Sequence, residues 1–216
     1  MKKIISFDLD GTLVDAKYGD MVWNHGIPEE YSKKHGMSFD EARAVVMDQY
    51  RSVGDADLLW YEIGYWLKRF DLPVKTEDLL ERYEAFIKPL PGAVEVVAYL
   101  KDKYMLIVAS NAARIFVEKE LERTKLTHHF RHIISATTDY GVVKKEPAFY
   151  RKLCADLGVL EEEIVHVGDH RVFDFEVPLS LGIEAYHCAD KSSGGSGQGG
   201  ENGNVIHSLT ELLAKL

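Results

Sequence analysis

Hydrophobic positions along the chain form short, nearly unbroken runs, and Met-Leu-Ile-Val-Ala at residues 105–109 is one example. Such runs are typical of strands that a parallel sheet buries on both faces. Segments with apolar residues at helical spacing lie between the runs. This alternation predicts an α/β fold with a doubly wound parallel sheet, a Rossmann-like core. The expected strands are residues 3–8, 104–109, 132–136, 164–168 and 183–187, and the expected helices are residues 92–103, 112–124, 147–157 and 172–181.

Residues 16–88 break this alternation, because the patterns in this stretch are helical. Ser38-Phe39-Asp40-Glu41 has the form of a capping box, in which a Ser and a Glu three residues later satisfy each other's backbone N–H groups. Apolar residues then recur at helical spacing as far as Val53. Two more helices are expected in this stretch, at residues 59–70 and 79–87.

Proline and glycine mark the boundaries between the parts of the chain. Pro89 and Pro91-Gly92 end the helical stretch and return the chain to the α/β pattern. We therefore expect two domains: an all-helical insertion at residues 16–88, and an α/β core formed by residues 1–15 and 89–216. Lys191 to Asn204, within the core, is dominated by Gly and Ser and predicts a mobile loop.

The composition restricts the classes of function. Hydrophobic residues make up 46% and charged residues 28%, as in ordinary globular proteins. A formal net charge of −9 disfavours broad binding to nucleic acid, which needs clustered Lys and Arg. Two cysteines are too few for a disulfide framework. No apolar run approaches the roughly 18 residues of a membrane span. We expect a cytoplasmic protein without a nucleic-acid or membrane partner, and its oligomeric state stays open.

Two carboxylates follow the first expected strand, in Phe7-Asp8-Leu9-Asp10-Gly11-Thr12. Side chains two residues apart share one side of an extended chain. The carboxyl ends of strands are also where open α/β sheets bind their ligands. Two such carboxylates repel each other unless a cation or a proton lies between them. The pair therefore indicates a cation site or acid–base chemistry, and the alternative is an acidic turn without chemistry.

Further polar groups follow the later strands. Ser110 and Asn111 end the second strand, where a hydroxyl and the amides of a turn can bind an anionic oxygen. Lys144 precedes a helix and could offset the charge of a phosphate. Gly168-Asp169 ends another strand, with Asp174 five residues after Asp169, and carboxylate oxygens suit Mg²⁺. Taken singly, the Ser could be a helix cap and the Lys a solvated charge.

Together, the order and spacing of these groups resemble the haloacid dehalogenase-like (HAD) superfamily. The matching features are Asp-x-Asp-Gly-Thr, a Ser at the end of a strand, a later Lys and Gly-Asp-x₄-Asp. The similarity extends over residues 1–15 and about 90–187. Residues 16–88 resemble the helical cap domain that one branch of the superfamily carries, the branch of phosphoglycolate phosphatase-like proteins.

The resemblance implies a role for each motif residue. Asp8 would be the nucleophile that forms an aspartyl phosphate. Asp10 would be the general acid that protonates the leaving oxygen and then activates water. Ser110, with Asn111, would hold the transferring phosphoryl group, and Lys144 would balance its charge.

The resemblance also implies a Mg²⁺ site. Asp8 and Asp169 would be direct ligands, and Asp10 would contribute its backbone carbonyl. Asp174 would be a further ligand or a partner of the ligands. From the cap, Tyr18 and Trp23 are the expected substrate-binding residues, since they follow the first motif closely.

These residues favour a Mg²⁺-dependent phosphatase that acts on a small phosphorylated metabolite. An L-2-haloacid dehalogenase also uses an aspartate nucleophile, but the halide that it releases needs no proton. Asp10 therefore favours phosphoryl transfer. A phosphomutase, which passes the phosphoryl group to a sugar hydroxyl, stays open. A catalytically silent metal- or phosphate-binding module is a further alternative, although it would have no need for both Asp8 and Asp10.

The two adjacent lysines generate a first prediction. Counting back from Pro147, Lys144 occupies the Lys position of the family, and Lys145 the position usually held by proline. Removing a charge from a water-excluded phosphoryl site costs a few kcal/mol, or roughly a hundredfold or more in rate. We therefore expect Lys144→Ala to cripple turnover of an aryl phosphate. Lys145→Ala is the matched control and should keep the rate within about a factor of three, as is usual for surface changes. The reverse pattern would show that the register is shifted by one residue.

Overall fold

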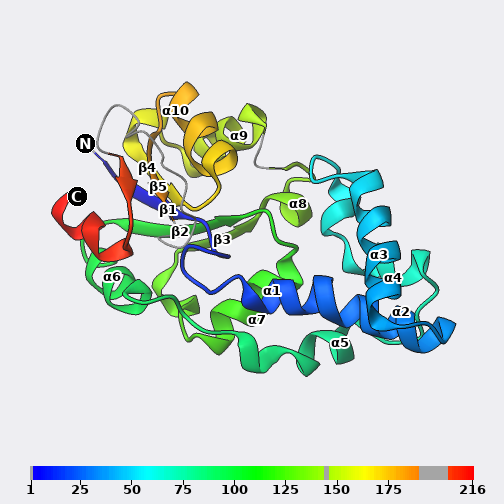
Figure 1. Ribbon diagram of the computed structural model, residues 1–216. Coiled ribbons are helices and arrows are strands. Elements are labelled where there is room, and N and C mark those ends of the chain that lie inside the picture. Colours follow the sequence, from blue (N-terminus) through cyan, green and yellow to red (C-terminus); the bar gives the residue numbers. More distant parts are fainter. Residues whose placement is uncertain (1, 144–145, 190–203) are drawn as a thin grey trace. The chain divides into compact units, whose positions relative to one another are not determined.

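The computed structural model describes residues 2–143, 146–189 and 204–216 (Figure 1). The expected loop at 191–204 thus lies, but for Asn204, outside the described residues, as does Lys144. The chain divides into two compact units, one formed by Met1–Val14 with Pro89–Leu216 and the other by Asp15–Lys88. None of the helices in the described part combines the length and the apolar character that a membrane span requires.

The first unit is built on a six-stranded sheet with the order β3-β2-β1-β4-β5-β6, in which each described pair of neighbours is parallel. β1 lies in the middle, and the chain turns to one side of it for β2 and to the other for β4. This order, together with helices on both faces, confirms the predicted doubly wound α/β class. The strands are β1 Ile4–Phe7, β2 Met105–Ser110, β3 His132–Ser135, β4 Ile164–Gly168, β5 Glu184–Cys188 and β6 Val205–Ile206.

Helices cover both faces of the sheet, with α6 and α7 on one face and α9 and α10 on the other (Figure 1). Under α9, its residues Phe149, Tyr150 and Leu153 pack against Ile4 and Ile107 of the strands. The apolar runs are thus buried on both faces, as predicted. The helices of this unit are α6 Ala93–Leu100, α7 Arg114–Arg123, α8 Ala136–Asp139, α9 Pro147–Leu157 and α10 Val177–Ser180, with short turns η4 Thr127–His129, η5 Glu161–Glu163, η6 Arg171–Glu176 and η7 Leu209–Ala214.

The expected helix at 172–181 differs from prediction. Its first part, η6, is a wider π-helical turn, and α10 begins at Val177. Pro178 has no N–H and cannot donate the α-helical bond to the carbonyl of Asp174, which favours the irregular geometry. This turn carries Asp174, so the irregularity lies next to the candidate chemistry.

The second unit, residues 15–88, is helical throughout its regular structure. The predicted capping box is present: Ser38 Oγ accepts from the Glu41 N–H, and the Glu41 carboxylate accepts from the Ser38 N–H. Its elements are α1 Lys17–Met21, η1 Val22–Gly26, α2 Ile27–His35, α3 Phe39–Val53, η2 Leu58–Tyr61, α4 Ile63–Arg69, α5 Thr76–Arg82 and η3 Glu84–Phe86.

Aromatic side chains fill the interior of this helical unit. The ring of Tyr50 lies edge-on to Trp66, with centroids 4.6 Å apart, and also contacts Trp23 and Trp60. The expected helix at 59–70 is broken at Glu62, whose backbone is extended. The Trp66 indole N–H donates to the Trp60 carbonyl across the break. These contacts give Trp60 and Trp66 a packing role.

Candidate active site

The site is built at the carboxyl ends of three neighbouring strands. β1 ends at Phe7, and its next residue is Asp8; β2 ends with Ser110; β4 ends with Gly168, before Asp169. Phe7 is level with Val108 of β2 on one side and Val167 of β4 on the other, so the three strands end within two residues of one another. The Asp8 N–H donates to the Val167 carbonyl at 2.8 Å, which continues the sheet bonding to the first residue of the site.

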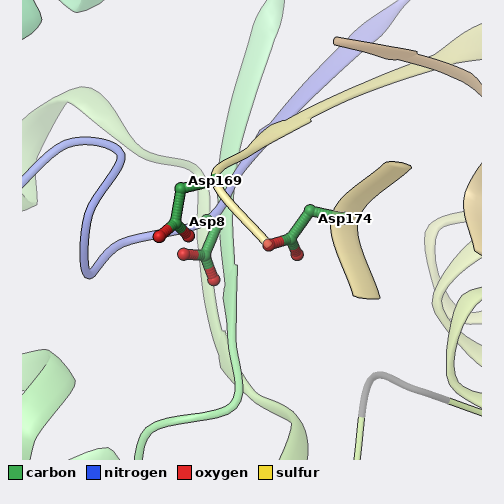
Figure 2. Close-up of side chains that lie close together, drawn as sticks. All are labelled: Asp8, Asp169 and Asp174. Atoms are coloured by element: carbon green, nitrogen blue, oxygen red, sulfur yellow. The ribbon is translucent and has the colours of Figure 1, made fainter. Parts of the chain in front are cut away.

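Three of the predicted metal ligands come together. Asp8, Asp169 and Asp174 each offer a carboxylate oxygen, and these oxygens lie within 4.8 Å of one another (Figure 2). Asp8 is 7% exposed and Asp174 1%, whereas Asp169 is exposed. Such a set of hard oxygen donors fits Mg²⁺, which prefers carboxylates and retains several waters.

Asp10 lies in a tight turn beside this cluster. The Gly11 N–H donates to the Val14 carbonyl at 2.7 Å, and Gly11 has a left-handed φ of 77°. A Cβ on Gly11 would lie 2.4 Å from a carboxylate oxygen of Asp169. Glycine therefore lets the turn approach the cluster. Among the described residues, Asp10 is not one of the clustered carboxylates, and its expected carbonyl contact with Mg²⁺ stays a prediction.

The side chain of Asp174 is held in a narrow slot. Its Oδ2 accepts from the His170 N–H at 3.1 Å, and its Oδ1 lies 3.1 Å from His166 Nε2. Gly168 faces the same side chain, and a Cβ there would lie 2.4 Å from both Cβ and Cγ of Asp174. Asp169 is also supported, because His187 Nε2 donates to its carbonyl at 2.8 Å.

The turn after β2 is fixed by hydrogen bonds. The Ser110 hydroxyl accepts from the Ala112 N–H at 3.1 Å. The hydroxyls of Ser135 and Thr137 donate to the carbonyls of Ala112 and Asn111. Ser110 and Asn111 are both buried, so this turn presents a constrained hydroxyl at the same sheet edge as Asp8. Their binding of a phosphoryl group stays a prediction.

The remaining predicted residues are Lys144, Tyr18 and Trp23. Lys144 is outside the described residues. Tyr18 and Trp23 belong to the helical unit. The Tyr18 side chain is fully buried, and its hydroxyl donates to the Leu80 carbonyl at 3.3 Å, while the Trp23 ring contacts Tyr50. Each therefore has packing partners within its own unit, and substrate binding by either residue stays a prediction.

Two buried groups near the site were missed by the sequence reasoning. Glu120 of α7 is fully buried; burial raises the pKa of its carboxyl well above the usual range, and the charges of Asp10 and Asp8 add to this rise. His166 lies fully buried within β4. Each interrupts an apolar pattern: Glu120 lies on the buried face of α7 and His166 lies between two valines. A polar residue at a position where the pattern requires an apolar one is the sequence signal that could have identified both groups.

Known proteins are similar to this chain in sequence and in fold. The sequence model of the haloacid dehalogenase-like hydrolases matches residues 2–177. The GMP/IMP nucleotidase YrfG of Escherichia coli (strain K12) is 25% identical over 186 residues, which cover 83% of this chain and 82% of that protein. The glyceraldehyde 3-phosphate phosphatase of Pyrococcus furiosus is 27% identical over 193 residues, covering 84% and 78%. A solved HAD phosphatase from Thermococcus onnurineus has a TM-score of 0.84 at 29% identity and covers 100% of this chain and 97% of that one.

The slot around Asp174 generates a second prediction. In Gly168→Ala, the new methyl group would overlap Asp174, because carbon atoms in contact normally lie about 3.5–4.0 Å apart. We expect a loss of about 1–3 kcal/mol in the free energy of unfolding, as is typical of overpacking, measured by denaturant titration. Gly64→Ala is the control, since its Cβ would meet nothing within 4 Å and alanine favours the helix. Equal stability of Gly168→Ala and the wild type would contradict the close packing of Asp174 against Gly168.

Proposed function

The chain belongs to the haloacid dehalogenase-like hydrolases, and from this premise we propose that it is a Mg²⁺-dependent phosphatase that hydrolyses small phosphorylated metabolites. The observation that carries the proposal is the cluster of Asp8, Asp169 and Asp174 beside the turn that holds Asp10. Two relatives named as a nucleotidase and a phosphatase support the same reaction class.

The carboxylate cluster is the proposed Mg²⁺ site. Asp8, Asp169 and Asp174 would hold the ion, with the Asp10 carbonyl as a further ligand. The donor set fits, because hard carboxylate oxygens are grouped where mutual repulsion otherwise opposes their ionisation. When bound, Mg²⁺ supplies charge neutralisation and orients the phosphoryl group against the nucleophile.

Asp8 is the proposed nucleophile. One of its carboxylate oxygens attacks phosphorus, and the bond from phosphorus to the ester oxygen breaks. Asp10, as the acid, gives its proton to that leaving oxygen. Water then attacks the phosphorus of the aspartyl phosphate and gives a proton to the Asp10 carboxylate. The bond from phosphorus to Asp8 breaks, inorganic phosphate leaves, and the Asp8 carboxylate is restored.

Ser110, Asn111 and Lys144 are the proposed groups that hold the transferring phosphoryl. The Ser110 oxygen already accepts a bond from the Ala112 N–H, so its own O–H proton can be donated to a phosphoryl oxygen. Lys144 would add the positive charge that balances the phosphoryl oxygens in the transition state. Substrate selection is assigned to the helical unit, with Tyr18 and Trp23 as the candidate contacts.

The alternative reactions differ in whether they need an acid at position 10 and in which molecule receives the phosphoryl group. Dehalogenation releases a halide that requires no proton, so an acid at position 10 has no task in it. A phosphomutase would return the phosphoryl group to a hydroxyl and would release little inorganic phosphate. A phosphatase and a phosphomutase would both use Asp8 and Asp10, and they are told apart by whether water receives the phosphoryl group and inorganic phosphate is released.

The test is release of inorganic phosphate from an aryl phosphate and from a panel of phosphorylated metabolites. We expect the activity to require Mg²⁺ and to vanish in excess chelator. Asp8→Asn should lower turnover by several orders of magnitude, because an amide is a poor nucleophile and loses a metal-binding charge. Asp10→Asn should slow both formation and breakdown of the intermediate.

Asp102→Asn is the matched control, since it makes the same chemical change at an exposed position of the same unit. It should keep wild-type turnover. Full activity in chelator would refute the metal dependence. Release of halide from a 2-haloacid, without phosphate release from any phosphate ester, would identify a dehalogenase instead.

A further inference from the structure

A row of hydrogen-bonded, buried polar side chains leads from the sheet to the carboxylate cluster. Ser6 of β1 and His166 of β4 are level with each other in the parallel register. His166 Nδ1 lies 3.0 Å from Ser6 Oγ, and His166 Nε2 lies 3.1 Å from Asp174 Oδ1. All three side chains are essentially inaccessible to solvent. Polar groups buried this deeply are costly unless they are hydrogen-bonded, so the three form a connected set.

The chemistry of the partners fixes the direction of the bonds. An ionised Asp174 can act solely as an acceptor, so His166 Nε2 must carry the proton and donate it. In the neutral ring, Nδ1 is then an acceptor and receives the Ser6 O–H. The Asp174 carboxylate thus selects the tautomer of His166 that carries its proton on Nε2, and the Ser6 hydroxyl completes the arrangement as the donor to Nδ1.

Other contacts hold the histidine ring and the carboxylate in place. The ring of Tyr150 lies edge-on to His166, with centroids 5.4 Å apart and an angle of 77° between the planes. On the other side of the carboxylate, the His170 N–H donates to Asp174 Oδ2. Each oxygen of the Asp174 carboxylate therefore has a directed hydrogen-bond partner.

We propose that His166, aligned by Ser6, is a positioning residue that holds the Asp174 carboxylate in the orientation in which it binds the divalent cation. This inference rests on the metal site of the proposed function and extends it to residues that do not touch the ion. Partners of this kind typically change metal affinity or activity by roughly ten- to a hundredfold when they are removed.

The test compares two amides that replace different ring nitrogens. His166→Gln places an N–H donor near the position of Nε2 and keeps the bond to Asp174. His166→Asn places its amide near Nδ1 and keeps a partner for Ser6 alone. Binding of Mn²⁺, a spectroscopic substitute for Mg²⁺, is measured on the full chain without substrate from the loss of its free-ion paramagnetic resonance signal, with Mg²⁺ as competitor. We expect His166→Gln to bind nearly as the wild type does and His166→Asn to bind roughly ten- to a hundredfold more weakly.

Ile164→Ala is the control for simple loss of packing, because Ile164 is equally buried and lies on the same face of β4. It should lower the melting temperature and leave the Mn²⁺ affinity unchanged. Equal affinities of the Gln and Asn variants, or a loss in Ile164→Ala as large as in His166→Asn, would overturn the positioning role, as would a wild type that binds no Mn²⁺. Binding that follows the predicted order in a protein that hydrolyses no phosphate ester would support the inference and refute the proposed function.

Discussion

Electrostatic repulsion between carboxylates at one edge of the sheet is the constraint on which the rest of the site depends. Asp8, Asp169 and Asp174 come from the ends of two neighbouring parallel strands and the π-helical turn after the second. Like charges this close are unfavourable unless a cation lies among them. The surrounding chain helps to keep them there: Gly11 and Gly168 permit close approach, and N–H groups of His166 and His170 fix the Asp174 carboxylate.

Much of the fold was predictable, because the local signals agree with the tertiary structure. Each expected strand is present within a residue or two, since a central parallel strand must be apolar on both faces. The capping box of α3 was equally readable. The break at Glu62 and the π-helical turn before α10 were not predicted. The bond from Trp66 to Trp60 spans the break and leaves no mark in the periodicity, and the irregular turn follows from the missing N–H of Pro178, whose effect falls on the preceding residues.

The candidate site also combines features that the sequence indicated with features that it did not. The Asp-x-Asp-Gly and Gly-Asp-x₄-Asp patterns pointed to Asp8, Asp169 and Asp174, whose carboxylates lie together at the edge where neighbouring strands end. Asp10, which the first pattern also contains, is not one of the clustered carboxylates among the described residues. Two buried polar residues were missed, because His166 and Glu120 each stand within an apolar pattern. Burying such groups is costly without partners. The substrate could not be predicted either. The expected contacts, Tyr18 and Trp23 of the helical unit, stay a prediction, because the aromatic residues of that unit also have packing partners there. The relatives are named for different phosphate esters.

Asp8 is the proposed carrier of the phosphoryl group during turnover. The most direct test is to quench the reaction with acid during the first turnover and to locate the phosphoryl group by mass spectrometry of the peptides. We expect a phosphorylated aspartate at position 8 that forms when Mg²⁺ is present and then decays as inorganic phosphate appears. Phosphate release without any phosphorylated Asp8 at times when the first turnover is incomplete would contradict it.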